Sequence, residues 1–228
     1  MEQLLMLHGA IGAKDQLEPL TAGLKNKYLV HAINFRGHGD ASFPGNGFSI
    51  SCFAEDVITY IEQHDLKAIN IFGYSMGGYV AMYPGRHYPH LISRIITLAT
   101  KFHWDQTIAA NEIQMLDANK ILEKIALFAK TLEKRHFPND WKIVPDKTKD
   151  MLLQLGISNK LQLKDYPNIS APCLLLLGDK DKMISADETV AVQRALPDAT
   201  FKLLPGTPHP IEQVDMKLLC SSIKDFLN

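Results

Sequence analysis

Cysteine is scarce in this chain of 228 residues. Cys52, Cys173 and Cys220 are odd in number and widely spaced, which fits neither a disulfide framework nor a CxxC metal site. We expect them to be buried or inert thiols, as free cysteines usually are. The chain is long enough to bury a substantial hydrophobic core, so it does not need disulfides to fold.

Long apolar runs and blocks of one charge are also missing. No stretch approaches the roughly 18 apolar residues of a membrane span, so no membrane partner is expected. The chain has 24 basic and 25 acidic residues, a net charge of −1, and no basic block, which argues against a nucleic-acid partner. The first ten residues, MEQLLMLHGA, carry an acid at Glu2 and only a short apolar run, unlike a signal peptide. The reducing cytoplasm is therefore the expected location.

Short apolar runs alternate with longer helical patterns along most of the chain. This alternation predicts βαβ units, and hence an α/β fold with a mostly parallel sheet and helices on both faces. The expected strands are Leu4–Leu7, Tyr28–Phe35, Ala68–Phe72, Arg94–Ala99, Cys173–Leu177 and Thr200–Leu204. The expected helices are Asp15–Lys27, one capped by Ser51, one from Met76, Ala186–Leu196 and Val214–Leu227.

The pattern changes between about Trp104 and Ser170. This region contains the helical runs Ile108–Arg135 and Lys147–Leu155 and no convincing strand. We therefore expect a core domain made of residues 1–103 and 171–228, with residues 104–170 as a helical insertion. Ligands of open α/β folds bind at the carboxyl edge of the sheet, and we expect the insertion to lie across that edge.

The segment Gly73-Tyr74-Ser75-Met76-Gly77 matches the pattern G-x-S-x-G. It follows an expected strand and opens an expected helix, which is the context that a nucleophile elbow requires. So sharp a turn needs residues without side chains beside the serine, and it leaves the Ser75 hydroxyl exposed. We predict that Ser75 is a catalytic nucleophile, with an ordinary Gly/Ser turn as the alternative.

A serine nucleophile needs a base, and the base needs an acid to orient it. His209 follows the last expected strand and is the predicted base. Asp179 and Asp181 follow the preceding expected strand, and either of these two carboxylates could orient the histidine. The order Ser, Asp, His along the chain is the one that this motif requires. Because turn aspartates commonly bind local backbone N–H groups, one of the two is expected to be structural.

An oxyanion hole needs two backbone N–H donors from different loops. The predicted donors are those of Met76, which follows the serine, and Ala10, in the loop His8-Gly9-Ala10-Ile11-Gly12. His8, His31 and His38 could suggest a metal site, but they lack a ligand spacing such as HExxH. We expect no metal and no cofactor.

These segments together resemble the α/β-hydrolase superfamily over nearly the whole chain. The matching segments are His8–Gly12, Phe35–Ser42, Gly73–Gly78, Gly178–Asp181 and His209. The resemblance implies the α/β-hydrolase fold, assigns the acid to Asp181 and gives His38 a structural role. It also implies that residues 104–170 form a cap, or lid, over the substrate.

Two features depart from the pattern of the superfamily. Pro84-Gly85 falls within the helix after the nucleophile and is expected to kink or shorten it. His209 is flanked by Pro208 and Pro210, where the superfamily places a glycine before the histidine.

The predicted activity is hydrolysis of a small-molecule carboxylester or thioester through an acyl-enzyme on Ser75. Two alternatives use the same residues. One is C–C bond hydrolysis or an elimination, and the other is a binding protein that keeps the pocket and has lost turnover. Nothing in the sequence indicates an oligomeric state.

Aromatic and apolar residues of the insertion and the segment before it are candidates for the pocket wall. The alternative is that they pack the helices onto the core domain. The candidates are Phe102, His103, Trp104, Met115, Phe128, Phe137 and Trp141.

Overall fold

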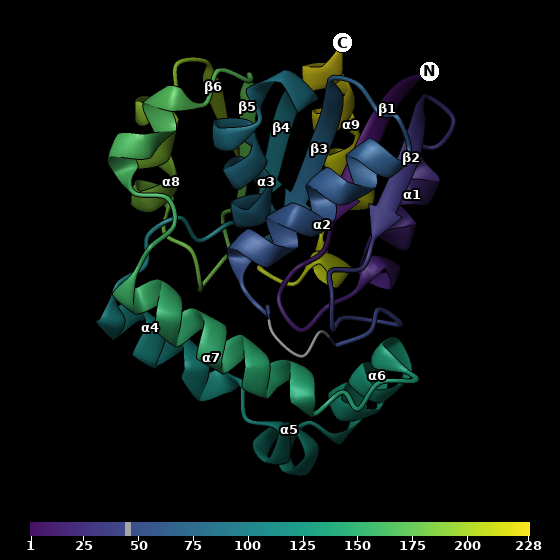
Figure 1. The fold of residues 1–228 in the computed structure, drawn as a ribbon, viewed down its shortest axis with the longest axis vertical. Helices are drawn as coiled ribbons and strands as arrows, with labels where there is room; N and C mark the ends of the chain where they lie inside the picture. The colour runs from purple at the N-terminus through teal and green to yellow at the C-terminus, as the bar shows by residue number, and fades with distance from the viewer. Residues whose placement is uncertain (44–46) are drawn as a thin grey trace.

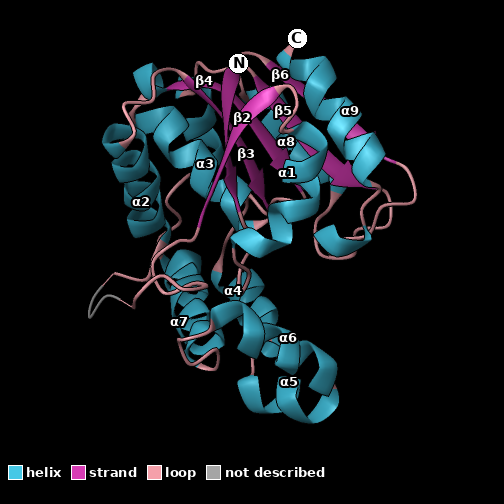
Figure 2. Ribbon diagram, turned by 90° about the vertical axis from the view of Figure 1, so that its right-hand side faces the viewer, coloured by secondary structure: helices cyan, strands magenta, loops and turns pink. Residues whose placement is uncertain are grey.

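A computed structural model describes residues 1–43 and 47–228. Its centre is a sheet of six parallel strands in the order β2-β1-β3-β4-β5-β6 (Figures 1 and 2). The strands are β1 (Glu2–Leu7), β2 (Tyr28–Ile33), β3 (Ile69–Tyr74), β4 (Ile92–Leu98), β5 (Cys173–Gly178) and β6 (Ala199–Leu204). The expected α/β-hydrolase fold with a mostly parallel sheet is confirmed.

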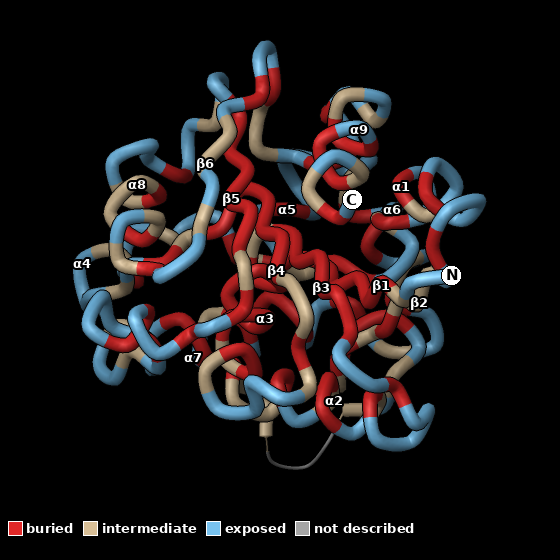
Figure 3. Tube along the Cα trace, turned by 90° about the horizontal axis from the view of Figure 1, so that it is seen from above, coloured by how far each residue is buried: buried red, intermediate tan, exposed pale blue. Residues whose placement is uncertain are grey.

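Burial follows the position of each strand in the sheet. All six residues of β3 and all six of β5 are buried, whereas most residues of the edge strands β2 and β6 are only partly buried or exposed. Figure 3 shows the same contrast, with the buried centre of the sheet inside a ring of partly exposed helices. Continuous apolar runs mark strands covered on both faces.

Helices cover both faces of the sheet. One face carries α2 (Ile50–Gln63), α3 (Met76–His87) and α8 (Ala186–Ala195), whose apolar residues join one buried cluster. The other face carries α1 (Glu18–Leu24) and α9 (Met216–Leu227) in a second cluster. The two outer helices pack closely, because a Cβ on Gly23 would lie 2.5 Å from Cys220 Sγ.

Every regular element between β4 and β5 is helical. These are α4 (Gln106–Glu112), α5 (Ala118–Lys124), α6 (Ala126–His136) and α7 (Ile143–Ile157), with short 3₁₀ turns at Ile113–Met115 and Leu163–Asn168. Figure 1 shows α4 to α7 beyond the carboxyl ends of the strands, with both chain termini at the opposite end. Side chains on these helices can therefore approach the loops that follow the strands.

One local expectation was wrong, and so was the shortening expected for the helix after Ser75. The cap of α2 is Ser49, whose extended backbone lets its hydroxyl accept a hydrogen bond from the Cys52 N–H at 3.3 Å, and Ser51 lies inside the first turn. Helix α3 is not shortened at Pro84-Gly85 and continues to His87. Gly85 has a packing role there, since a Cβ on it would lie 2.5 Å from the Ile95 side chain of β4.

Candidate active site

Ser75 occupies the single residue between β3 and α3. Its backbone has φ of 51° and ψ of −115°, a region that L-residues rarely adopt. Two hydrogen bonds hold it there: its N–H donates to the Leu98 carbonyl at 2.8 Å, and the Thr100 hydroxyl donates to its carbonyl at 3.1 Å. The strained turn is therefore fixed by the neighbouring strand β4 and the loop that follows it.

The glycines of the turn allow backbone segments to touch. A Cβ on Gly73 would lie 2.4 Å from backbone atoms of Gly77 and Gly78, and one on Gly77 would lie 2.5 Å from the Leu7 carbonyl oxygen. Real Cβ atoms do not come so close to other heavy atoms. This contact brings the start of α3 against the end of β1, where the loop containing Ala10 begins.

His209 and Asp181 are directly hydrogen-bonded. The distance from His209 Nδ1 to Asp181 Oδ2 is 2.8 Å, and the Asp181 side chain is fully buried. The second oxygen of Asp181 accepts from the backbone N–H groups of Met183 at 2.8 Å and Ile184 at 3.0 Å. Burial raises the pKa of Asp181, but the His209 hydrogen bond and these backbone donors outweigh it, so the net pKa lies below the usual range.

The ionised Asp181 determines which nitrogen of His209 carries the proton. A carboxylate only accepts, so Nδ1 must be the donor and Nε2 of the neutral ring is left with a lone pair. Nε2 can therefore act as a base. Asp179, two residues away, binds the backbone of the histidine loop instead of the ring.

Ser75 and His209 line the same cavity, of about 110 Å³. Its wall is mainly apolar, with one ion pair, in which Lys101 Nζ lies 3.3 Å from Glu112 Oε1. Lys101 also donates to the Met183 carbonyl at 2.9 Å. The cavity is lined by Ala10, Ile50, Ser75, Met76, Tyr79, Lys101, Trp104, Glu112, Met115, Leu116, Leu152, Leu155, Met183, Ile184 and His209.

A second cavity, of about 750 Å³, shares Trp104 with the first as a wall residue. Phe102 and His103 line the second cavity and not the first. Trp104 is therefore in contact with both the small cavity at Ser75 and the larger one. Two backbone N–H groups, of Phe102 and His103, donate to Glu188 Oε1 and hold the segment before Trp104.

The remaining pocket candidates are divided between the cavity wall and other surroundings. Met115 lines the cavity at Ser75. Phe128 and Trp141 pack instead with Ala129 and Leu132 in a cluster between the helices, and Phe137 is exposed. Helical spacing indicates only that a side chain faces inward, so it did not separate these two surroundings.

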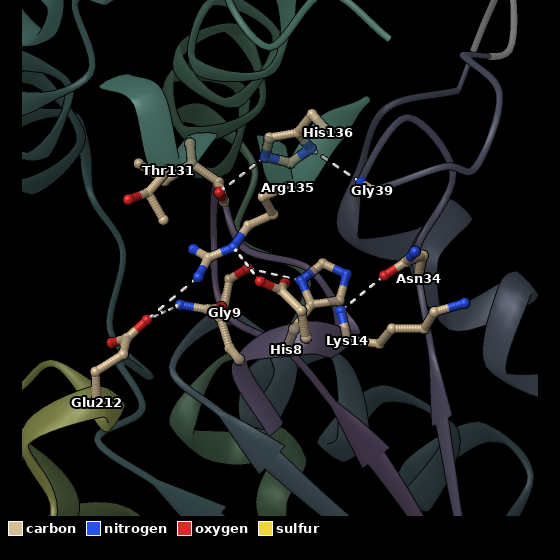
Figure 4. Close-up of polar contacts among 12 residues, drawn as sticks. His8, Gly9, Lys14, Asn34, Gly39, Thr131, Arg135, His136 and Glu212 are labelled. Carbon is tan, nitrogen blue, oxygen red and sulfur yellow. Dashed lines mark hydrogen bonds and ion pairs between the residues drawn. The ribbon is translucent and has the colours of Figure 1, made fainter. Parts of the chain in front are cut away.

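Ala10 and Met76 also line the cavity. Met76 is the first residue of α3, so its N–H has no acceptor within the helix. The loop before Ala10 is held by His8, whose Nδ1 lies 2.8 Å from the Gly9 carbonyl oxygen (Figure 4). The same carbonyl accepts from the Gly12 N–H at 3.2 Å. Burial lowers the pKa of His8 to about 3, so its ring is neutral and its other nitrogen accepts from the Phe35 N–H at 3.2 Å.

Among the other histidines, His38 is buried and its Nε2 has no hydrogen-bond partner in the part of the chain that the structure describes. His31 is hydrogen-bonded to Tyr60 and Gln3. Over residues 1–43 and 47–228, no three His, Cys, Asp or Glu side chains are arranged to hold a metal ion. The thiols of Cys173 and Cys220 are buried. None of the described helices has the length and apolar character needed to span a bilayer.

Three residues in or near the site were missed by the sequence analysis: Lys101, Glu112 and His136. Lys101 follows β4, so its position after a strand was the available signal. Glu112 and His136 lie on helices whose placement against the sheet has no local signature.

A parallel sheet with a strained serine between β3 and α3 defines the α/β hydrolases, and the chain is an α/β hydrolase. A family model described as serine aminopeptidase, S33, matches residues 2–213, and the chain belongs to that family.

Comparison with individual proteins supports the same class. The chain is 21% identical over 244 residues to 2-(acetamidomethylene)succinate hydrolase of Mesorhizobium japonicum, covering 99% of this chain and 87% of that protein. Its fold is similar to that of a thermophilic esterase from Thermogutta terrifontis, with a TM-score of 0.76 and 21% identity, covering 100% and 89% of the two chains. It is also similar to the enol-lactonase from Burkholderia xenovorans, with a TM-score of 0.79 and 17% identity, covering 99% and 91%.

Proposed function

We propose that this protein hydrolyses small carboxylesters or thioesters with Ser75 as nucleophile, His209 as base and Asp181 as the orienting acid. The observation that carries the proposal is the 2.8 Å hydrogen bond between His209 and Asp181, formed by a histidine that shares a cavity with Ser75. The resemblance to an esterase and to an enol-lactonase favours the same chemistry.

The proposed reaction has two steps. As Ser75 Oγ bonds to the carbonyl carbon, its proton passes to His209 Nε2, and the Ala10 and Met76 N–H groups stabilise the negative oxygen. His209 then gives that proton to the leaving alcohol or thiol, and the carbon–oxygen or carbon–sulfur bond breaks. Water then attacks the acyl carbon and loses a proton to His209. His209 returns that proton to Ser75 Oγ as the bond between this oxygen and the acyl carbon breaks, which releases the acid and restores the serine.

The size and chemistry of the cavity support a short, uncharged acyl group. The charges of Lys101 and Glu112 are paired with each other, and the rest of the wall is mainly apolar. A charged acyl group would lose its hydration there without an unpaired partner, which is costly. We propose that helices α4 to α7, within residues 104–170, act as a cap that sets this size.

A reducing, cytoplasmic setting is part of the proposal, since Cys52, Cys173 and Cys220 are free thiols.

The test is labelling by a fluorophosphonate, comparing wild type with Ser75→Ala and with Ser51→Ala as a matched control on α2. We expect Ser75→Ala to abolish labelling and to lower turnover of a p-nitrophenyl ester by about 10⁴-fold or more, because the nucleophile is lost. Ser51→Ala should behave as wild type. Esterase turnover that persists in Ser75→Ala would contradict the proposal, and so would a folded wild type that the probe does not label.

A further inference from the structure

His136 is the last residue of α6. It links the segment that contains helices α4 to α7 (the helical segment) to two loops of the sheet domain. It is fully buried. Its Nε2 lies 3.0 Å from the Ile11 carbonyl oxygen, and its Nδ1 lies 2.9 Å from the Gly39 backbone nitrogen (Figure 4). The carbonyl can only accept and the N–H can only donate, so the ring must be neutral with its proton on Nε2. Burial lowers the pKa of His136, in agreement with a neutral ring.

The contact with Ile11 lies next to the proposed oxyanion donor. In a trans peptide the N–H and the preceding carbonyl point in opposite directions. The Gly9 carbonyl, bound by His8 and by the Gly12 N–H, therefore sets the direction of the Ala10 N–H. On the other side of Ala10, Ile11 has φ of 49°, a strained value for a β-branched residue. His136 holds the carbonyl of this strained residue, and that carbonyl belongs to the same peptide plane as the Gly12 N–H that donates to Gly9.

Neighbours of His136 anchor the end of α6 independently. Arg135 donates from Nε to Asp15 at 3.0 Å and lies 3.5 Å from Glu212, three residues after His209. Asn139 donates to the carbonyls of Gly39 at 2.9 Å and Ala41 at 2.8 Å. A substitution at His136 therefore leaves other hydrogen bonds that hold the helix in place.

We propose that His136 is a positioning residue that, through the Ile11 carbonyl, keeps the Ala10 N–H directed at the developing oxyanion. This inference rests on the proposed function. It gives the helical segment a second role, because the segment then contributes to the rate of the reaction as well as covering the cavity. Loss of the contact should weaken transition-state binding and leave ground-state binding unchanged.

Two substitutions separate the two hydrogen bonds of His136. The amide nitrogen of Gln can replace Nε2, so His136→Gln keeps a donor for Ile11. The amide oxygen of Asn can replace Nδ1, so His136→Asn keeps only the acceptor for Gly39. Thr131→Val, on an exposed position of the same helix whose hydroxyl donates to the Leu127 carbonyl, is the control.

With a short-chain p-nitrophenyl ester, we expect His136→Asn to lower kcat by about 10-fold to 100-fold with little change in KM, a fraction of the effect of deleting an oxyanion donor. His136→Gln and Thr131→Val should stay within about threefold of wild type. A trifluoromethyl ketone, which forms an oxyanion on Ser75, should bind more weakly to His136→Asn by the same factor as kcat falls.

Unchanged kcat and inhibitor affinity in a folded His136→Asn would overturn the inference. Equal losses in both His136 variants with a raised KM would also overturn it, since they would indicate a purely structural anchor. The proposed function is judged separately by Ser75→Ala: if that variant keeps wild-type turnover, both proposals fail. If turnover depends on Ser75 and His136→Asn matches wild type, only this inference fails.

Discussion

Asp179 accepts a hydrogen bond at 3.1 Å from the backbone N–H of Thr207. The Thr207 carbonyl in turn accepts from the Lys180 N–H at 3.0 Å, so the loop after β5 and the loop that carries His209 are joined in both directions. Asp181, two residues on, binds the His209 ring. The two carboxylates therefore differ in partner, one holding the loop and the other holding the imidazole.

This difference predicts opposite responses to the same substitution. Asp179→Asn keeps an oxygen acceptor for Thr207 and should leave kcat within about threefold of wild type, at the cost of about 1 kcal/mol in unfolding free energy or less. Asp181→Asn offers an amide that cannot orient His209 in the required tautomer, and kcat should fall by about 10³-fold to 10⁴-fold. Steady-state kinetics of both variants tests which carboxylate orients His209. A larger loss of kcat in Asp179→Asn than in Asp181→Asn would assign the acid role to Asp179.

Trp104 predicts how the range of substrates can be widened. Because it lines both the 110 Å³ and the 750 Å³ cavities, Trp104→Ala should join them. We expect kcat/KM for a long-chain p-nitrophenyl ester to rise relative to that for the acetate by about tenfold or more, with acetate turnover changed little. Phe128→Ala, in the separate helical cluster, is the control and should not change the ratio. An unchanged ratio in Trp104→Ala would mean that the larger cavity takes no part in binding the acyl chain.

The backbone of Ser75 predicts an unusual effect on stability. Its positive φ costs an L-residue about 1–2 kcal/mol, and glycine adopts it without that strain. Ser75→Gly should therefore unfold at a Tm at least as high as that of Ser75→Ala. For a protein of this size, each kcal/mol of relieved strain raises the Tm by roughly 2–4 °C. Both variants lack the nucleophile, and the larger unfolded-state entropy of glycine offsets part of the strain that it relieves. A clearly lower Tm for Ser75→Gly would show that the turn is not strained in solution.

Buried neutral histidines predict that the protein loses stability in mild acid. Burial lowers the pKa of His8 to about 3, and burial also places that of His38 well below its ordinary value. The His38 ring lies 4.9 Å from that of His8 and 6.1 Å from that of His136, so protonating one ring disfavours protonating the others. The unfolded chain takes up these protons at a pKa of about 6.5.

Below about pH 6.5 the unfolded state binds more protons than the folded state, so the unfolding free energy falls as pH falls. Each buried histidine should contribute up to about 1.4 kcal/mol per pH unit between about pH 6 and the folded-state pKa. Urea unfolding at about pH 7.5, 6.5 and 5.5 measures the slope above the range of the carboxylates. Replacing the exposed His90 with Gln should leave the slope unchanged, and a flat profile in wild type would contradict the assignment.

Most of the sheet and the elbow could be read from the sequence because their signals are local. Each expected strand was found, and the central strands gave the clearest signal because a strand buried on both faces is a continuous apolar run bounded by turn residues. The glycines around Ser75 are equally local, because the turn they permit spans only a few residues. Ser51 was predicted as the cap in place of Ser49 because both hydroxyl residues lie at the start of the helix, and only the extended backbone at Ser49 distinguishes the cap.

The environment of the cavity could not be read in the same way. His136 contacts Ile11 and Gly39 across 125 and 97 positions of the chain, and no periodicity encodes such a pairing. Trp104 and Trp141 are alike in residue type, yet one lines the cavity and the other packs between helices. Their difference depends on how α4 to α7 sit against the sheet.

The close contacts of the glycines have a consequence for second-site suppression. A side chain on Gly23 would collide with Cys220 Sγ, a side-chain atom, so a defect in Gly23→Ala should be repaired by Cys220→Gly or Cys220→Ala. A side chain on Gly73 would collide with the backbone of Gly77 and Gly78, which every residue possesses. Genetic selection from a Gly73 defect should therefore recover only true revertants.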